Sequence, residues 1–297
     1  MIDARIRIQF VSDIHLEMIR NKYFDPSQIV VPGEAEFLAL CGDIGYPEDA
    51  ILEEFLRFCS SKYRRVFWVP GNHEFYSPSS THHMTIQDKF KKMESLCHTF
   101  PNITLMNQTA VDIAGTPLRI IGCPLWTNIP DDFASTAQKY MNDFRLIYKT
   151  QADRITVNDL NVWHNSDRAW IESEIRAAEQ SGHELVVLTH HLPTQRLVHE
   201  KYEDHPLNVC FATSLDSIIR FPVRAWLCGH SHTANEARVN SVLCALNPGG
   251  YPGETEAGHD PRKILTVVFK NEESNYSFND TYLRGYDDVD TSSSDDA

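Results

Sequence analysis

Short segments rich in aspartate, asparagine and histidine follow five of the apolar runs in this 297-residue chain. In chain order they are Ser12-Asp13-Ile14-His15, Gly42-Asp43, Gly71-Asn72-His73-Glu74, His190-His191 and Gly229-His230-Ser231-His232. The preceding runs, at residues 6–11, 37–41, 66–69, 185–189 and 225–228, have the composition of β-strands. Because open α/β sheets bind ligands beyond the carboxyl ends of their strands, we expect the five segments to converge. Clustered side chains of these types are what a two-metal site requires.

Further β-prone runs at 118–121, 242–246 and 264–269 alternate with helical stripes at 47–59, 84–97 and 166–179, which predicts a layered α/β fold. Two hairpins are predicted, one joining 111–113 to 118–121 and one joining 237–239 to 242–246. Residues 124–163 form a long insertion that bears aromatic residues, and we expect a lid-like loop near the active site. We therefore predict a single domain at 1–286 and a disordered acidic tail at 287–297.

The charge balance, 27 Lys and Arg against 41 Asp and Glu, gives a net charge of -14 and counts against binding of long nucleic acids, but not of a nucleotide. Two basic groups, Lys62-Arg64-Arg65 and Lys89-Lys91-Lys92, flank predicted helices and are interpreted as solvated surface. The seven cysteines include no CxxC pair, so we expect buried thiols of a reducing compartment. With neither a signal peptide nor a run of membrane-spanning length, the chain is expected to be cytoplasmic, without membrane contact. Its oligomeric state is not indicated.

The ordered motifs DxH, GD, GNHE, H and GHxH, from Asp13 to His232, resemble those of the calcineurin-like metallophosphoesterase superfamily. The resemblance implies a two-sheet β-sandwich flanked by helices, with a dinuclear metal site at the C-terminal ends of the strands. It also implies a ligand set: Asp13, His15 and His232 for one metal, Asn72, His190 and His230 for the other, and Asp43 as the bridge. Oxygen and imidazole ligands without thiolate suit two divalent ions from among Mn, Fe, Zn, Mg and Co. A hydroxide bridging such ions is the expected nucleophile.

His73 follows the expected ligand Asn72 and resembles the general acid of this superfamily. A histidine pKa of about 6.5 suits proton donation at neutral pH, and Glu74 or Asp43 could raise that pKa. The alternative is that His73 only forms hydrogen bonds within its own loop.

Either member of the pair His190-His191 could be the metal ligand. We favour His190, the first residue after the strand at 185–189, which leaves His191 to face the pocket or the substrate.

The segments at 141–145 (MNDFR) and 247–251 (NPGGY) resemble a mostly bacterial group within the superfamily. Arg145 could clamp a phosphate oxygen, or it could form a surface ion pair with Asp143. Asn128 is a candidate for substrate binding, and so are nearby aromatic residues of the insertion, namely Trp126, Phe133 and Tyr148.

These features predict a metal-dependent phosphoric-ester hydrolase that acts on a small or medium phosphorylated molecule. The alternative within the enzyme class is a phosphodiesterase or nuclease acting on nucleotides or cyclic nucleotides, because the same centre cleaves diesters. A non-catalytic protein-binding scaffold is disfavoured, since every expected ligand and His73 are present. A protein serine/threonine phosphatase is disfavoured because Gly42-Asp43 lacks the arginine that follows in those enzymes.

Overall fold

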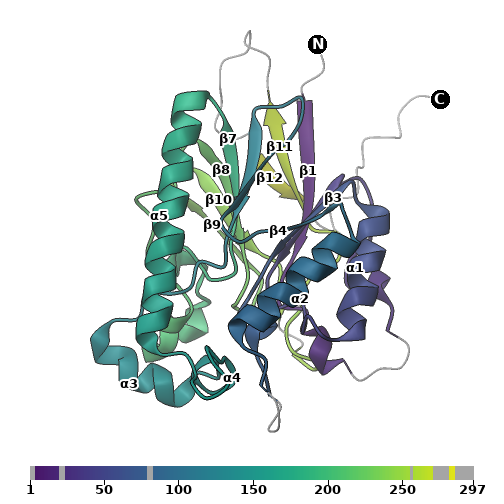
Figure 1. Ribbon diagram of the computed structural model, residues 1–297. Coiled ribbons are helices and arrows are strands. Elements are labelled where there is room, and N and C mark those ends of the chain that lie inside the picture. Colours follow the sequence, from purple (N-terminus) through teal and green to yellow (C-terminus); the bar gives the residue numbers. More distant parts are fainter. Residues whose placement is uncertain (1–3, 20–23, 79–82, 255–256, 270–280, 285–297) are drawn as a thin grey trace, which may run out of the picture.

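The computed structural model describes residues 4–19, 24–78, 83–254, 257–269 and 281–284. Over these ranges the chain forms two mixed six-stranded sheets that pack face to face between outer helices (Figure 1). The predicted two-sheet fold flanked by helices is therefore confirmed.

The first sheet has the strand order β12-β11-β1-β2-β3-β4. Its strands are β1 (Ala4–Val11), β2 (Phe37–Cys41), β3 (Arg65–Val69), β4 (Ile103–Leu105), β11 (Ile264–Phe269) and β12 (Thr281–Arg284). Strands β1 to β4 run parallel, whereas β11 pairs antiparallel with β1 and β12 pairs antiparallel with β11. The carboxyl ends of β1, β2 and β3 consequently lie at one edge of the sheet.

The second sheet has the strand order β5-β6-β7-β8-β10-β9. Its strands are β5 (Thr109–Asp112), β6 (Leu118–Gly122), β7 (Glu184–Leu188), β8 (Val223–Cys228), β9 (Asn235–Val239) and β10 (Val242–Leu246). Strands β6, β7, β8 and β10 are parallel. The antiparallel pairs β5/β6 and β9/β10 confirm the two predicted hairpins.

The central strands are buried on both faces, and their alternating side chains feed two different cores. In β2, Phe37, Ala39 and Cys41 point between the sheets, where they join a cluster that includes Ile120 and Val186 of the second sheet. The intervening side chains of β2 point outward beneath the helices of the first sheet. This double burial explains why the strands read as continuous apolar runs.

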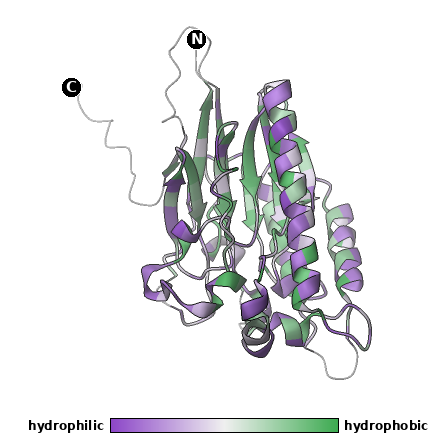
Figure 2. Ribbon diagram, turned by 90° about the vertical axis from the view of Figure 1, so that its left-hand side faces the viewer, coloured by the Kyte–Doolittle hydropathy of each residue, from purple (hydrophilic) through white to green (hydrophobic). Residues whose placement is uncertain are grey.

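Helices α1 (Ala50–Lys62) and α2 (Ile86–Thr99) cover the first sheet, and α5 (Val157–Ser181) covers the second (Figure 1). α5 inserts Ile171, Ile175 and Ala178 into the outer core of its sheet. Figure 2 shows predominantly hydrophobic strands behind this helix, which carries much of its hydrophilic surface toward the viewer. Short 3-10 helices lie at Leu16–Met18, Pro26–Gln28, His73–Phe75, Gln195–Leu197, Glu200–Tyr202 and Pro206–Cys210.

The insertion at 124–163 differs from the predicted loop because most of it is helical. It contains α3 (Asp131–Tyr140), α4 (Asp143–Leu146) and the first two turns of α5. The helix predicted at 166–179 begins earlier because the Thr156 hydroxyl accepts a hydrogen bond from the Asp159 amide while the Asp159 carboxylate accepts one from the Thr156 amide. This capping box satisfies two amide groups at the start of the helix.

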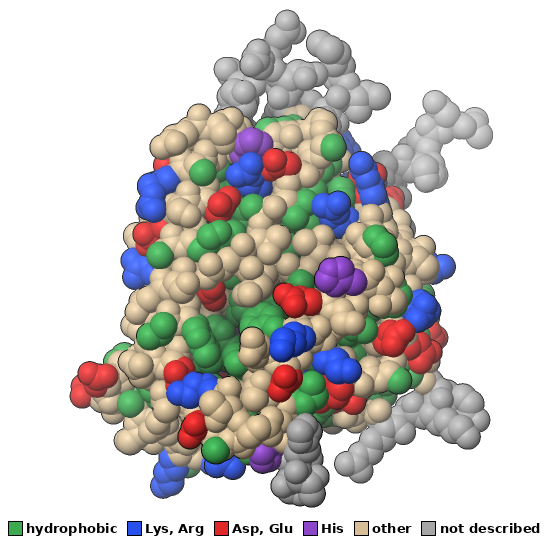
Figure 3. Space-filling view, viewed as in Figure 1, with side chains coloured by type: hydrophobic (Ala, Val, Ile, Leu, Met, Phe, Trp, Pro, Cys, Tyr) green, Lys and Arg blue, Asp and Glu red, His purple; other side chains and the backbone are tan. Residues whose placement is uncertain are grey.

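Several surface and compositional expectations can be compared with the structure. All seven cysteines lie in the described ranges and are unpaired, and only Cys97 among them is not fully buried. Lys89 was predicted on a solvated face, but it is buried, because its Nζ contacts both Glu48 carboxylate oxygens and lies over the ring of Tyr46. On the face shown in Figure 3, Lys and Arg side chains are interspersed with acidic ones.

None of the helices in the described ranges has the length and apolarity to cross a bilayer. The predicted tail at 287–297 lies outside the described residues.

Candidate metal centre

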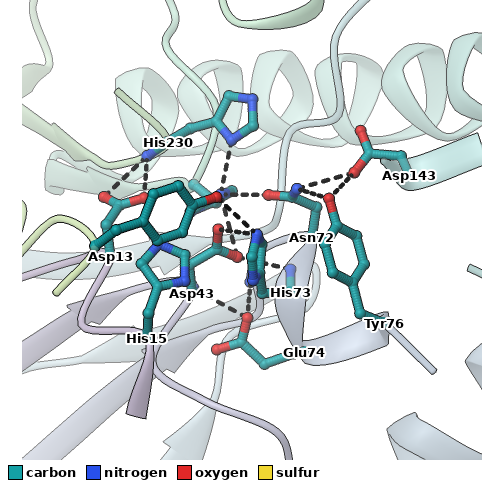
Figure 4. A network of polar contacts seen from close by, with 12 residues as sticks. Asp13, His15, Asp43, Asn72, His73, Glu74, Tyr76, Asp143 and His230 are labelled. Atoms are coloured by element: carbon teal, nitrogen blue, oxygen red, sulfur yellow. Dashed lines mark hydrogen bonds and ion pairs between the residues drawn. The ribbon is translucent and has the colours of Figure 1, made fainter. Parts of the chain in front are cut away.

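The loops that follow β1, β2, β3, β7 and β8 meet at the C-terminal edge of the two sheets. They bring together every side chain that the sequence predicts as a metal ligand, as Figure 4 shows for Asp13, His15, Asp43, Asn72 and His230. Parallel strand ends from both sheets therefore build a single centre.

One group of ligand atoms comes from Asp13, His15 and His232, and these atoms lie within 4.8 Å of one another. The Nε2 atoms of His15 and His232 are 3.1 Å apart, and His232 Nε2 lies 3.7 Å from Asp13 Oδ1. Asp13 is held in place by the His230 amide, which donates to its carboxylate at 2.9 and 3.0 Å.

A second group with the same spacing comes from Asp43, His190 and His230. Nε2 of His190 lies 3.1 Å from His230 Nδ1, 3.5 Å from Asp43 Oδ1 and 2.9 Å from Asn72 Oδ1. Asp43 also forms a group of this spacing with His15 and His73, so its carboxylate lies where it faces both sets of ligands.

Each of the four clustered histidines directs its outer ring nitrogen at a protein acceptor. The pairs are His15 Nδ1 with Glu17 Oε1 (3.2 Å), His232 Nδ1 with Glu254 Oε2 (2.8 Å), His190 Nδ1 with the Cys41 carbonyl (2.9 Å) and His230 Nε2 with the Cys210 carbonyl (3.3 Å). An N–H on the outer nitrogen leaves a lone pair on the inner nitrogen of a neutral ring, the arrangement of metal-binding histidines. Inner nitrogens facing each other at 3.1 Å suit shared cations, which the residues present therefore fit.

The backbone at the centre is held in left-handed conformations that side chains disfavour. Asp13, His15, Asp43 and His230 have φ values of 52°, 52°, 54° and 68°. Such strain persists where the surrounding structure fixes it, and it concentrates at functional sites. Close packing adds a second restraint, because a Cβ on Gly71 would lie 2.2 Å from Asp43 Oδ1.

Glu74 acts on the backbone, which corrects the expectation that it could influence His73 directly. Its buried carboxylate accepts hydrogen bonds from the amides of Asp43 (2.9 Å), Ile44 (3.0 Å) and Gly71 (2.8 Å). Burial raises the pKa of Glu74 to about 7, and the charge of Asp43 adds to this effect. The residue thereby joins the loops that carry Asp43 and Asn72, a role that local sequence does not reveal.

His73 instead pairs with Glu17, a residue that sequence reasoning missed. The His73 Nδ1 lies 2.9 Å from Glu17 Oε1, and its Nε2 lies 3.3 Å from the Tyr251 hydroxyl and 3.9 Å from Asp43 Oδ2. Although burial lowers the pKa of His73, Asp43 and Glu17 outweigh it and raise that pKa. The only available signal for Glu17 was its place in the segment Asp13-Ile14-His15-Leu16-Glu17.

The carboxylates and imidazoles of the centre also polarise one another. Burial by itself raises the pKa of Asp43, but His190 and His73 outweigh it and hold that pKa well below its usual range. Burial lowers the pKa of His190, yet Asp43 and Asp13 raise it to about 10. The opposite shifts of these two pKa values show that the aspartates and histidines of the buried centre stabilise each other's charged forms.

The insertion reaches the centre through Asp143. Its Oδ1 accepts hydrogen bonds from Asn72 Nδ2 (2.9 Å) and from the Tyr76 hydroxyl (2.6 Å), which Figure 4 shows beside the centre. Because Nδ2 of Asn72 is engaged there, Oδ1 of Asn72 points toward His190.

The predicted substrate-binding residues do not join the cluster. Arg145 is exposed and its guanidinium donates to the Lys139 carbonyl. The Asp143 carboxylate, the alternative partner predicted for Arg145, instead accepts hydrogen bonds from Asn72 and Tyr76. Asn128 is exposed, and its backbone N–H donates a hydrogen bond to the Thr213 hydroxyl. His191 is buried behind the centre, with Nδ1 facing the Pro124 carbonyl at 3.4 Å, because consecutive residues after a strand point in different directions.

Among the aromatic residues predicted beside the substrate, Trp126 and Tyr148 are buried in the protein and Phe133 faces a neighbouring groove. A cavity of about 360 Å³ opens onto the centre, lined at its base by Asp43, Asn72, His73, His230 and His232.

Residues 6–234 match the calcineurin-like phosphoesterase family. An uncharacterized protein of Acanthamoeba polyphaga mimivirus is 32% identical over 265 residues, which cover 83% of this chain and 92% of the viral protein.

Solved structures share the fold at low sequence identity. The phosphopantetheinyl hydrolase of Mycobacterium tuberculosis superposes with a TM-score of 0.63 at 17% identity, covering 86% of this chain and 95% of that one. A dimetal phosphatase from Danio rerio gives a TM-score of 0.51 at 12% identity, covering 95% of this chain and 99% of that one.

Proposed function

Because the chain belongs to the calcineurin-like phosphoesterase family, and is thus a metal-dependent phosphoester hydrolase, we propose that its seven clustered side chains hold two divalent ions for hydrolysis of a small phosphorylated molecule. Asp13, His15 and His232 would hold one ion and Asn72, His190 and His230 the other, with Asp43 between them. The observation that carries this proposal is the pairing of inward imidazole nitrogens at 3.1 Å on both sides of Asp43.

When bound, two such ions supply Lewis acidity toward phosphoryl oxygens and a water of lowered pKa as nucleophile. The protein contributes preorganisation, since the outer nitrogen of every ligand histidine is already bonded to Glu17, Glu254 or a backbone carbonyl. Fixed ligands of this kind require little rearrangement during the reaction.

We propose that His73 protonates the leaving oxygen. Its Nδ1–H donates to Glu17, which fixes the ring so that Nε2 faces the cavity beside Asp43. Asp43 and Glu17 raise the pKa of His73, which favours the protonated imidazole that a general acid needs. Proton transfer of this type contributes on the order of 10²- to 10⁴-fold to a rate.

The unpaired cysteines favour a reducing compartment, and we propose a cytoplasmic site of action.

The test is hydrolysis of p-nitrophenyl phosphate by the purified protein after removal of metals and reconstitution with Mn²⁺. Asp43→Asn and His73→Ala should each lower kcat at least about 100-fold while the far-UV circular dichroism spectrum stays unchanged. His98→Ala, an exposed residue near the end of α2, is the matched control and should keep wild-type turnover. Unchanged turnover in both centre variants would refute the mechanism. Hydrolysis of bis(p-nitrophenyl) phosphate at a higher kcat/KM would favour the phosphodiesterase alternative.

A further inference from the structure

Beyond the metal centre, most side chains in the wall of its cavity are uncharged; the exceptions are the titratable His205 and Glu254, whose carboxylate is paired with His232 Nδ1 at 2.8 Å. Apolar groups come from Met141 beside α4 and from four residues between β7 and β8, namely Leu192, Val198, Leu207 and Phe211. Neutral polar groups come from Asn142, Asn208 and Ser231. Among the described residues that line this cavity there is no lysine and no arginine.

Two tyrosines at the cavity are unusually exposed for their type. Tyr140 is 56% exposed and Tyr202 is 45% exposed, and both line the cavity. Lys139 Nζ lies 5.0 Å from the ring centroid of Tyr140 and Lys201 Nζ lies 5.0 Å from that of Tyr202, but neither lysine is among the residues that line the cavity. Exposed aromatic rings beside an apolar wall are suited to packing against a ring of a ligand.

An acidic groove adjoins the cavity. A larger groove of about 930 Å³ shares Val198, His205 and Asn208 with the cavity. It is lined by Glu200, Glu203 and Asp204, whereas the guanidinium of Arg196 there is paired with Asp216 at 3.2 Å. A substrate that leaves the centre in this direction meets negative charge.

Building on the proposed function, we infer that the substrate is the phosphomonoester of an uncharged, partly apolar alcohol that bears a ring, and that Leu207 and Tyr202 select it. The single phosphoryl group binds at the metal centre, and the alcohol packs against the apolar wall. A second anionic group that packs against this wall, as in a nucleoside diphosphate, would be desolvated there without a lysine or arginine as partner and near the carboxylate of Glu254. Hydrolysis breaks the P–O bond, with water as the co-reactant, and releases inorganic phosphate and the neutral alcohol.

A matched substrate pair isolates the charge. 4-Carbamoylphenyl phosphate and 4-carboxyphenyl phosphate have nearly the same shape and differ by one negative charge. The Mn²⁺-loaded wild type should hydrolyse the carbamoyl ester with kcat/KM at least about tenfold higher, a difference that one poorly compensated charge can supply. Equal kcat/KM for the two esters would overturn the inference.

Substitutions then assign the selectivity to the wall. Leu207→Lys places a cation in the half-buried wall and should lower the ratio of kcat/KM for the carbamoyl ester to that for the carboxy ester at least about fivefold. The neutral control Leu207→Met should leave this ratio unchanged. Tyr202→Ala should raise KM for 1-naphthyl phosphate more than for phenyl phosphate. An unchanged charge preference in Leu207→Lys, or equal KM increases for both aryl esters, would contradict the assigned residues.

Failure of the proposed function is distinguishable from failure of this inference. If none of the esters is hydrolysed with any divalent ion, the proposed function fails. The inference about the cavity wall is then tested by calorimetric binding of 4-carbamoylbenzylphosphonate and 4-carboxybenzylphosphonate to the Mn²⁺-treated protein. Tighter binding of the carbamoyl compound would support it, and equal or absent binding would overturn it.

Discussion

Replacing Glu74 by alanine should destabilise the protein strongly, although Glu74 is not among the proposed metal ligands. The carboxylate accepts three backbone amides, from Asp43, Ile44 and Gly71, within a fully buried environment. A buried donor that loses its partner costs about 1–3 kcal/mol, so three of them cost roughly 3–9 kcal/mol. Water entering the space that the side chain leaves would hold the effect near the lower figure.

The loss is measurable by thermal unfolding of the metal-free protein, followed by circular dichroism at about pH 6. This is below the raised pKa of Glu74, about 7, because ionisation of the buried carboxyl at higher pH costs stability and would offset part of the loss. For a domain of this size, 1 kcal/mol corresponds to about 2–4 °C in Tm, so Glu74→Ala should lower Tm by at least about 6 °C. The Tm of Glu74→Gln should fall between those of the wild type and Glu74→Ala, because in either orientation of its side-chain amide the NH₂ group faces backbone N–H donors.

The matched control is Glu53→Ala on α1, whose carboxylate is 45% exposed and pairs only with Arg57 four residues later. An exposed pair of this kind contributes about 0.3–0.5 kcal/mol, so its Tm should change by less than about 2 °C. A Glu74→Ala protein with a Tm within about 2 °C of wild type would refute the reasoning, since the two loops would then be held together without the carboxylate.

Three further predictions concern protonation and metal binding. Burial raises the pKa of Asp167 from 3.8 to about 6, so the folded protein favours the protonated carboxyl and loses stability as the pH rises from about 4 to about 7. In denaturant titrations over this range, the unfolding free energy of the wild type should fall by about 3 kcal/mol relative to that of Asp167→Asn. Parallel pH profiles of the two proteins would contradict this prediction. Glu17→Gln removes a charge that raises the pKa of His73, so the alkaline limb of the kcat/KM profile should move to lower pH, and an unmoved limb would show that Glu17 does not act through His73. Chelation of metals should lower Tm reversibly, with about 2.7 kcal/mol regained at a free Mn²⁺ concentration 100 times Kd, and a Tm insensitive to Mn²⁺ would argue against the centre.

Much of the architecture could be predicted because strands and ligand segments are local features. The run 37–41 is apolar throughout because β2 is covered on both faces, and Gly42-Asp43 directly follows it. The insertion was harder to predict, since its helices α3 and α4 are short, at ten and four residues, and α3 packs against segments distant in the chain. The start of α5 was missed because its capping box, Thr156 with Asp159, begins ten residues before the expected helix.

The sequence by itself determined the metal-binding character of the chain, since the residue types and their places after strands are local properties. Only the tertiary structure decided which side chains contact these residues. It turned His190 and not His191 toward Asn72, directed Glu17 to His73, and left Arg145 on the surface. These outcomes depend on the directions in which loops from two different sheets leave their strands. Side-chain direction at such a meeting point is fixed by contacts between residues distant in the chain, which no local pattern encodes.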